Sequence, residues 1–417
     1  MHVAQPLPSG PSPPRPPRVS SSHLLTQWGL ARLARAFRGV PVRLELWDGS
    51  YADFSTAESV ATVRVRDRAT LLNLTMRPAV AFGEAYAAGR IVVDGDLVPM
   101  LVAVNQALAA RPYPGRPPRE GRITPARARH NVHAHYDIGN DFYRLWLDET
   151  MAYTCAYFTD PEATLERAQQ AKLEYVCRKL QLRPGDHVIE AGCGWGALAL
   201  HMARTHGVTV SAYNVSASQL AFARAEAVRA GLADRVTFVN DDYRAIAGRA
   251  DAFVSIGMLE HVGREQYPEL GRAIDRVLDP ARGRGLLHFI GRDAPMPFNA
   301  WIAEYIFPGA YAPALSEVLS GVLEPCGLSV FDVENLRPHY ARTLTHWLDR
   351  FEARADRVQK MFDEAFVRTW RLYLASAAAC FLSGSLQLFQ VTFGRPADDS
   401  RPWTRDVLYR RRADGSL

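Results

Sequence analysis

Short apolar stretches alternate with longer segments of helical periodicity in the second part of the chain, from about residue 130 onward. The stretches are bounded by turn residues and are rich in β-branched and aromatic side chains, which is typical of buried strands. Helices are expected between most of them, including 162–180 and 216–230, the second of which begins with an N-capping serine. The predicted strands are residues 187–191, 208–213, 236–240, 252–256, 286–290, 328–333 and 386–393.

This alternation predicts an α/β fold with a mostly parallel, doubly wound sheet. In such sheets, ligands bind beside the carboxyl ends of the strands. Polar residues fall at or just past four of the predicted strand ends, namely Glu190, Asn214, Asp242 and Glu260. We therefore expect a polar ligand site along one rim of the sheet.

The first part of the chain has a different pattern. Residues 23–110 combine short β-like stretches at 42–47 and 61–65 with apolar helical segments near 78–88 and 97–110. They predict a small α+β accessory domain without an obvious catalytic cluster.

Two segments flank this small domain. Residues 1–22 are rich in proline and lack the apolar core of a signal peptide, so a disordered lead is expected. Residues 111–129 are dense in arginine, proline and glycine, with Glu120 as the single acid. They are interpreted either as a solvated linker or as a basic strap that lies against anionic phospholipid head groups. Residues 130–417 form the predicted catalytic domain.

One uncharged run, residues 372–394, is long enough to span a bilayer. It contains several serine and glutamine residues, and its pattern changes from helical to alternating at Ser383 and Gly384. A buried helix, a turn and a core strand are therefore predicted instead of a membrane span.

Composition narrows the possible partners. The chain has 417 residues, of which 48% are hydrophobic and 22% charged, and its net charge is +5. This charge is too weak and too dispersed to indicate nucleic acid, but it is compatible with an anionic lipid surface. The five cysteines have no paired spacing for zinc, so no metal site is predicted, and their odd number argues for a reducing cytosol.

The most informative segment runs from Val188 to Gly196 and reads Val-Ile-Glu-Ala-Gly-Cys-Gly-Trp-Gly. An acid at a strand tip can hold a cationic or hydroxyl group, and the glycines that follow allow backbone to approach a ligand closely. The third glycine comes one residue too early for the dinucleotide fingerprint. The candidate residues here are Glu190, Gly192, Cys193, Gly194 and Gly196.

Further candidates follow the next strands. Asn214 stands where many nucleoside sites place an acid, and Ser216 and Gln219 could bind the ribose, although Ser216 could simply cap its helix. Asp242 is able to accept a hydrogen bond from an adenine amine, and Tyr243 is able to stack on the base. With Glu190, these residues favour S-adenosylmethionine as the ligand.

Several motifs make residues 133–393 resemble the cyclopropane-fatty-acyl-phospholipid synthases and the mycolic acid cyclopropane synthases. The motifs are His135-Tyr-Asp-Ile-Gly-Asn-Asp-Phe-Tyr143, Met151-Ala-Tyr-Thr-Cys-Ala-Tyr-Phe158, Gln169-Gln-Ala-Lys172, Gly192-Cys-Gly-Trp-Gly196, Gly257-Met-Leu-Glu-His-Val-Gly263, Leu287-His-Phe-Ile-Gly291, Trp301-Ile-Ala-Glu-Tyr-Ile-Phe-Pro308 and His339-Tyr-Ala-Arg-Thr-Leu344. The resemblance implies a seven-stranded, Rossmann-like class I methyltransferase domain that uses S-adenosylmethionine.

The resemblance also implies roles for individual residues. It adds Tyr153 and Thr154 to the cofactor site, with threonine replacing the family's usual serine, and it leaves the cofactor contact of Asn214 open because the family usually has threonine there. The residues that it places around a bicarbonate ion, the general base of the reaction, are Cys155, Glu260, His288, Ile290 and Tyr340. His261 is expected to be structural.

The implied reaction transfers a methyl group to the cis double bond of an unsaturated phospholipid acyl chain and closes a cyclopropane ring. A methyl- or methylene-branched product, or a lipid- or cofactor-binding protein without catalysis, are the alternatives. The resemblance suggests a cytoplasmic enzyme that associates peripherally and transiently with the anionic inner face of the membrane. A homodimer is left open, and nucleic acid is not expected as a partner.

Overall fold

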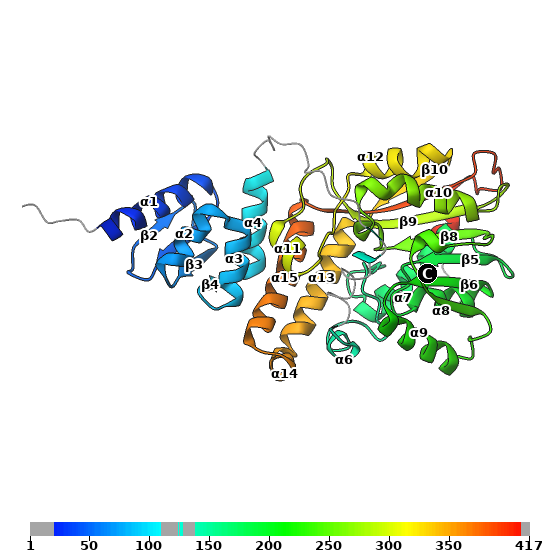
Figure 1. Ribbon diagram of the computed structural model, residues 1–417, viewed down its shortest axis with the longest axis horizontal. Coiled ribbons are helices and arrows are strands. Elements are labelled where there is room, and N and C mark those ends of the chain that lie inside the picture. Colours follow the sequence, from blue (N-terminus) through cyan, green and yellow to red (C-terminus); the bar gives the residue numbers. More distant parts are fainter. Residues whose placement is uncertain (1–20, 110–123, 125, 128–137, 410–417) are drawn as a thin grey trace, which may run out of the picture.

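The computed structural model describes residues 21–109, 124, 126–127 and 138–409. Within them, two sheets lie in different parts of the molecule (Figure 1), and the long helices α13 (Arg337–Glu352) and α15 (Glu364–Ser383) lie between these sheets. The proline-rich lead and the basic linker predicted from the sequence fall almost entirely outside the described residues.

The larger sheet has seven strands in the order β10-β11-β9-β8-β5-β6-β7. Strands β5 to β9 pair in parallel, whereas β11 runs antiparallel to both of its neighbours. The predicted α/β fold is confirmed, and each predicted strand appears with its ends shifted by two residues at most. The strands are β5 (His187–Ala191), β6 (Thr209–Asn214), β7 (Val236–Asn240), β8 (Ala252–Ile256), β9 (Arg284–Gly291), β10 (Ser329–Asn335) and β11 (Gln387–Gly394).

Helices connect these strands. Thr164 caps α7 by accepting a hydrogen bond from the backbone of Arg167, and Ser216 caps α9 in the same way. Apart from α13 and α15, the helical elements of this part are α6 (Asn140–Tyr143), α7 (Leu165–Lys179), α8 (Ala197–His206), α9 (Ala217–Arg229), η1 (Tyr243–Ala245), η2 (Leu259–His261), η3 (Arg264–Gln266), α10 (Tyr267–Val277), α11 (Ala300–Tyr305), α12 (Leu315–Val318), η4 (Leu319–Leu323), η5 (Glu324–Cys326), α14 (Ala355–Met361) and α16 (Asp406–Tyr409).

The smaller sheet has the order β2-β1-β3-β4, with β1 and β3 parallel. Its helices α3 and α4 pack against α15 (Figure 1), and one hydrophobic core runs from Val63 on β3 to Trp347 on α13. The elements are α1 (Ser21–Ala36), β1 (Val42–Leu46), β2 (Tyr51–Asp53), β3 (Ala61–Val65), α2 (Arg68–Met76), α3 (Pro78–Ala87), β4 (Ile91–Gly95) and α4 (Leu97–Ala109).

The uncharged run at 372–394 forms the end of α15, a turn and β11, as predicted. Gly384 caps α15 with a left-handed backbone, at φ 82°, which glycine adopts without strain. Every residue of β11 is buried. Among the described helices, none combines the length and the apolar character that a bilayer span requires.

Candidate active site

The three glycines between β5 and α8 have positive φ and serve different purposes. A Cβ atom on Gly192 would lie 2.9 Å from the Cβ of Met258, and one on Gly196 would lie 3.0 Å from Ala223 and Phe238. These two positions are glycine because neighbouring side chains pack against their backbone. A Cβ on Gly194 would meet no atom of the described residues within 4 Å. Open space above Gly194 is what a ligand that approaches the loop requires.

A cavity of about 150 Å³ lies at this rim of the sheet. It is lined by segments that follow β5, β6, β7 and β8, and by the stretch that precedes α7. The predicted cofactor residues that line it are Tyr153, Thr154, Glu190, Gly192, Cys193, Gly194, Asn214, Gln219, Asp242 and Tyr243. Gly196 and Ser216 are not part of the lining: Gly196 begins α8, and Ser216 is buried as the cap of α9.

Glu190, the penultimate residue of β5, lines this cavity and is buried. Burial raises the pKa of its carboxyl group, and Lys172 draws that pKa downward. Its Oε2 atom has no hydrogen-bond partner among the described residues. A buried polar atom of this kind costs about 1–3 kcal/mol, so a donor on a ligand would be favoured here.

Lys172 comes from α7 and is also buried. Burial lowers the pKa of its ammonium group, while the acids around it, Asp148 and Glu190 among them, raise that pKa. The ammonium donates a hydrogen bond to Thr154 Oγ1 over 2.9 Å. Thr154 stands where the family usually has serine, and its hydroxyl is therefore held by a cation at the cavity.

The backbone around Tyr153 and Thr154 is tightly fixed. Gln169 of α7 donates from Nε2 to the carbonyl oxygens of Ala152, at 3.2 Å, and Thr154, at 2.8 Å. Met151 has a left-handed backbone, with φ 58°, which is strained for a residue with a side chain. The Tyr153 hydroxyl lies 2.6 Å from that of Tyr373 on α15. Such fixed geometry is typical of a binding site.

Asn214 turns its amide into the loop system. Its Nδ2 donates to Gln219 Oε1 over 2.8 Å and to the carbonyl oxygen of Gly194 over 3.2 Å. Ser216 Oγ accepts from the backbone N–H of Gln219 and acts as the helix cap. Asn214 thus connects the glycine loop to Gln219, and both side chains line the cavity.

Asp242 and Tyr243 share the neighbouring Arg244. Asp242 Oδ1 accepts from Arg244 Nη1 over 2.8 Å, and the guanidinium lies 4.5 Å from the centroid of the Tyr243 ring. Arg244 therefore covers one face of the ring that was expected to stack on a base. Glu269 accepts from the same guanidinium and fixes it.

Glu260 lies in η2, just past the end of β8, and is buried. Its Oε1 accepts from the backbone N–H of Ile290 over 2.6 Å, and its Oε2 has no hydrogen-bond partner among the described residues. Burial raises the pKa of this carboxyl group to about 7, against the opposing effect of the Ile290 amide. His261, the next residue, lines the cofactor cavity.

His288 lies on β9, two residues before Ile290, and is buried. Its Nδ1 is 3.0 Å from Nε2 of Gln390, its direct partner on β11. Because an amide nitrogen can only donate, Nδ1 is the acceptor and Nε2 carries the proton. Burial holds the pKa of the imidazole well below its usual value, so the ring is neutral. The Nε2–H has no acceptor among the described residues.

Cys155 follows Thr154 in the segment that precedes α7, and Tyr340 lies on α13. Burial raises the pKa of the Cys155 thiol, which donates to the Ala156 carbonyl oxygen over 3.1 Å, so the group is a thiol and not a nucleophilic thiolate. The Tyr340 ring packs 4.6 Å from Phe381 and 6.0 Å from Trp347, measured between ring centroids. Trp347 in turn lies 5.2 Å from Tyr153.

Four contributors were not assigned a role from the sequence: Gln169, Lys172, Tyr373 and Gln390. The motif Gln169-Gln-Ala-Lys172 helped to carry the resemblance, and its Gln169 and Lys172, three residues apart and so on one helix face, were the available indication of a role. Tyr373 and Gln390 lie in apolar runs, where nothing in the sequence distinguishes them from core residues.

Comparison with known proteins agrees with this geometry. The family model described as mycolic acid cyclopropane synthetase matches residues 124–391, and a domain family of unknown function (DUF7884) matches residues 31–109. The probable fatty acid methyltransferase of Pseudomonas putida is 36% identical over 401 residues, which are 91% of this chain and 100% of the relative. The cyclopropane-fatty-acyl-phospholipid synthase of Escherichia coli K12 is 39% identical over 268 residues, 64% of this chain and 68% of the relative.

A solved structure of mycolic acid cyclopropane synthase CmaA1, complexed with SAH and CTAB, aligns with a TM-score of 0.61 at 30% identity, over 64% of this chain and 98% of that chain. The cavity fits such a cofactor, because it combines open space above Gly194 with the unpaired, buried Oε2 of Glu190. The chain therefore belongs to the mycolic acid cyclopropane synthetase family and is an S-adenosylmethionine-dependent methyltransferase.

Proposed function

We propose that this protein transfers the methyl group of S-adenosylmethionine to the cis double bond of an unsaturated phospholipid acyl chain and closes a cyclopropane ring. The observation that carries the proposal is that two buried polar groups outside the lining of the cofactor cavity are unsatisfied. Glu260 Oε2 and the His288 Nε2–H are both buried and both lack a partner among the described residues.

The cofactor cavity fulfils the first requirement of this reaction. When bound, S-adenosylmethionine supplies an electrophilic methyl group. An isolated alkene is a poor nucleophile, so the two reactants must be held at near-attack distance. Gln169, Lys172 and Tyr373 fix the segment around Tyr153 and Thr154, and this rigidity supports such positioning.

Methyl transfer leaves positive charge on the acyl chain. The hydroxyl of Tyr153 contacts that of Tyr373, and the ring of Tyr373 packs against Phe307. Aromatic faces of this kind stabilise a cation in a dry pocket. Glu260 adds a carboxylate to the same region of the protein. Its raised pKa leaves both protonation states accessible near neutral pH, which suits a group that shares a proton with a neighbour.

Ring closure requires a base that removes a proton from the transferred methyl group. The donor set fits bicarbonate, since the neutral His288 offers an N–H and Tyr340 a hydroxyl, while Glu260 can share a proton. Cys155 would add a weak S–H only if its thiol turned away from the Ala156 carbonyl oxygen. Bicarbonate bound by these groups would supply the base. The Ile290 N–H already donates to Glu260, so we assign Ile290 the role of orienting that carboxyl group.

A phospholipid substrate implies that the enzyme acts at a membrane surface. A net charge of +5 and the basic segment at 111–129 support transient binding of a cytoplasmic enzyme to anionic head groups. The division into a small domain at 23–110 and a catalytic domain at 130–417 belongs to this proposal, as does a homodimer.

A methyl- or methylene-branched product is the second candidate. The Pseudomonas putida relative, which is similar to almost the whole chain, is named a probable fatty acid methyltransferase. A methylene branch arises from the same cation by a hydride shift and loss of a proton, whereas a saturated methyl branch requires in addition a hydride donor.

Lipid analysis decides between these products. The protein is expressed in a host that lacks cyclopropane fatty acids, and the acyl chains are examined by mass spectrometry with fragmentation. We expect a ring across the former double bond. Methylene-branched chains, which have the same mass but fragment differently, would support the second candidate. Unchanged lipids and no transfer of labelled methyl to unsaturated phospholipid in vitro would indicate a binding protein.

A further inference from the structure

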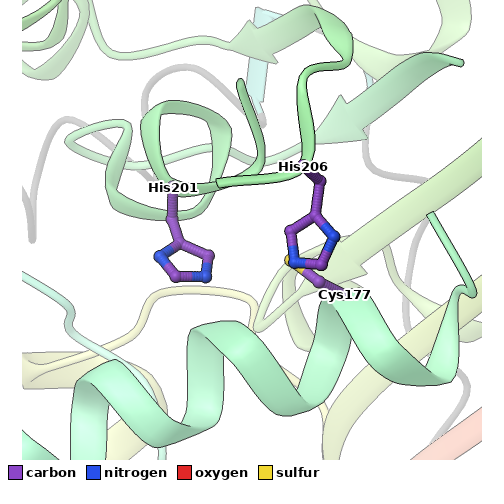
Figure 2. Close-up of side chains that lie close together, drawn as sticks. All are labelled: Cys177, His201 and His206. Carbon is purple, nitrogen blue, oxygen red and sulfur yellow. The ribbon is translucent and has the colours of Figure 1, made fainter. Parts of the chain in front are cut away.

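A second group of chemically active side chains lies between helices α7 and α8, and its residues are separate from the lining of the cofactor cavity. Cys177 comes from α7, and His201 and His206 come from α8 (Figure 2). One ligand atom of each residue lies within 4.8 Å of those of the other two. We propose that these three residues, together with Glu174, form a zinc-binding site.

The two helices present the group from opposite sides. Glu174 and Cys177 are three residues apart on α7 and therefore share a helix face. The two imidazoles extend from α8 toward α7, and the ring of His206 lies beside the Cys177 sulfur (Figure 2). The sequence did not indicate this site, because the cysteine is unpaired and its partners follow a strand and a loop later.

Glu174 gathers the two imidazoles. Its Oε2 lies 3.4 Å from His201 Nε2 and 3.1 Å from His206 Nε2, and its Oε1 accepts from Arg178 over 3.0 Å. The Glu174 carboxyl group therefore faces two imidazole nitrogens and is fixed from its other side by the Arg178 guanidinium.

These donors match zinc in type and number. Zn²⁺ takes thiolate, imidazole and carboxylate ligands in a tetrahedral arrangement, with bonds of about 2.0–2.3 Å. Such bonds place the ligand atoms roughly 3.5 Å apart. The atoms of Cys177, His201 and His206, which lie within 4.8 Å of one another, therefore need to approach by about 1 Å, and Glu174, which already lies beside both imidazoles, needs to turn toward Cys177. Gln170 Nε2 lies 2.9 Å from His201 Nδ1. Because an amide nitrogen can only donate, zinc binding through His201 Nε2 requires the Gln170 amide to turn its oxygen toward Nδ1–H, where it would orient the ring as the outer partner of a metal-bound histidine.

Burial indicates a structural role. Cys177, Glu174 and His201 are buried, whereas the side chain of His206 is 15% exposed and offers a route for the ion. Helix α7 carries Gln169 and Lys172, and α8 begins at the glycine loop. A metal that joins these helices would stabilise both supports of the cofactor site without contacting the cofactor.

The test uses the full-length protein, reduced and stripped with a chelator. Titration with Zn²⁺ alone should give about one ion per chain by elemental analysis and should raise the melting temperature. Co²⁺ in its place should give the absorption band of a cobalt–thiolate bond. Cys177→Ser should abolish this band, and His206→Gln should weaken Zn²⁺ affinity by at least about tenfold.

Cys326→Ser is the matched control, because Cys326 is a free, partly buried cysteine elsewhere in the chain. It should keep both the band and the stoichiometry. The proposal is overturned if the wild type takes up no zinc or gives no thiolate band, or if the band persists in Cys177→Ser. Because the first two results come from the wild type, a variant that fails to fold does not obscure the outcome. The site makes no use of the proposed lipid chemistry, so its failure leaves that proposal intact.

Discussion

At the scale of single residues, the site is marked by buried polar atoms that have no hydrogen-bond partner within the part of the chain that the structure describes. Glu260 and His288 each have one side-chain atom that forms a hydrogen bond and one that has no partner among the described residues. The Oε2 atom of Glu190 likewise has no partner there, and Lys172 draws the pKa of this carboxyl group downward. Leaving such atoms unpaired destabilises the folded protein, so their presence favours bound ligands. Each of these residues allows a direct test.

Glu260→Gln should nearly abolish turnover while leaving S-adenosylmethionine affinity within a few-fold of wild type. The substitution keeps the shape and the bond from Ile290 but removes both the negative charge and the acidic proton. Steady-state kinetics with labelled cofactor, together with calorimetric binding, measure the two effects. Unchanged turnover would remove Glu260 from the mechanism.

The stability of the ligand-free protein should also reveal Glu260. Its pKa rises from 4.5 to about 7 on folding, so its stabilising contribution is present below about pH 4.5 and is lost as the pH rises through about 7. The always-neutral Glu260→Gln should therefore gain stability relative to wild type between about pH 5 and about pH 8, by up to roughly 3 kcal/mol. Urea unfolding across this range measures it, with the exposed Glu265→Gln as control. A difference that does not change with pH would contradict the burial argument.

If bicarbonate is the base, His288→Ala and Tyr340→Phe should weaken ion binding more than cofactor binding. A donor to a charged group is worth about 1.5–3 kcal/mol, so ion affinity should fall roughly 10- to 150-fold. Added bicarbonate should partly restore activity, more readily in Tyr340→Phe. Full wild-type activity in bicarbonate-depleted buffer at constant pH, with no rescue of either variant, would mean that a protein side chain is the base.

At the scale of elements, the loop between β5 and α8 separates ligand access from packing. Gly192 and Gly196 allow close contact with Met258 and Phe238, whereas Gly194 alone faces open space. Helix α7 packs against α8, which follows the loop, and its Gln169 and Lys172 bond to the segment that carries Thr154. Cofactor binding therefore depends on both the shape of this loop and the position of α7.

Gly194→Val should abolish S-adenosylmethionine binding, because a branched side chain would fill the space above the loop. Gly231→Val is the matched control: Gly231 also has a left-handed backbone, with φ 65°, and open space around a Cβ, but it lies outside the cavity lining. Both variants should lose similar stability, roughly 1–2 kcal/mol, from the left-handed backbone. Wild-type cofactor affinity in Gly194→Val, measured by calorimetry, would show that the loop does not hold the cofactor.

At the scale of the whole molecule, the small sheet and the large one are joined through a shared core. Helices α3 and α4 pack on α15, and the other side of α15 sends Tyr373 to Tyr153 in the active site. At this junction Gly83 of α3 lies against Trp301 of α11, where a Cβ would come within 2.2 Å of the indole nitrogen. The contact fixes how closely the two parts approach.

Gly83→Ala should therefore destabilise the protein, by roughly 1–3 kcal/mol, because the added methyl overpacks the junction. Chemical unfolding measures the loss. Removing the large ring should relieve it, so Gly83→Ala should cost less in a Trp301→Leu background than in wild type. Equal costs in the two backgrounds would mean that the two side chains do not constrain each other.

The sequence by itself determined the parts of this protein that depend on local order. Strand periodicity located β5 to β11, and the break at Ser383 and Gly384 predicted the turn between α15 and β11. Glu190 and the three glycines that follow it lie within nine consecutive residues, Val188 to Gly196, so the pattern of the cofactor loop can be read directly from the sequence. In each case, neighbours in the chain are neighbours in space.

Only the tertiary structure decided the contacts between distant segments. Tyr153 meets Tyr373 across 220 positions, and His288 meets Gln390 across 102, so no local pattern relates the members of either pair. The same holds for Cys177 and the two histidines of α8. Burial, which raises the pKa of Glu260 and keeps His288 neutral, likewise arises only when these segments pack and exclude water.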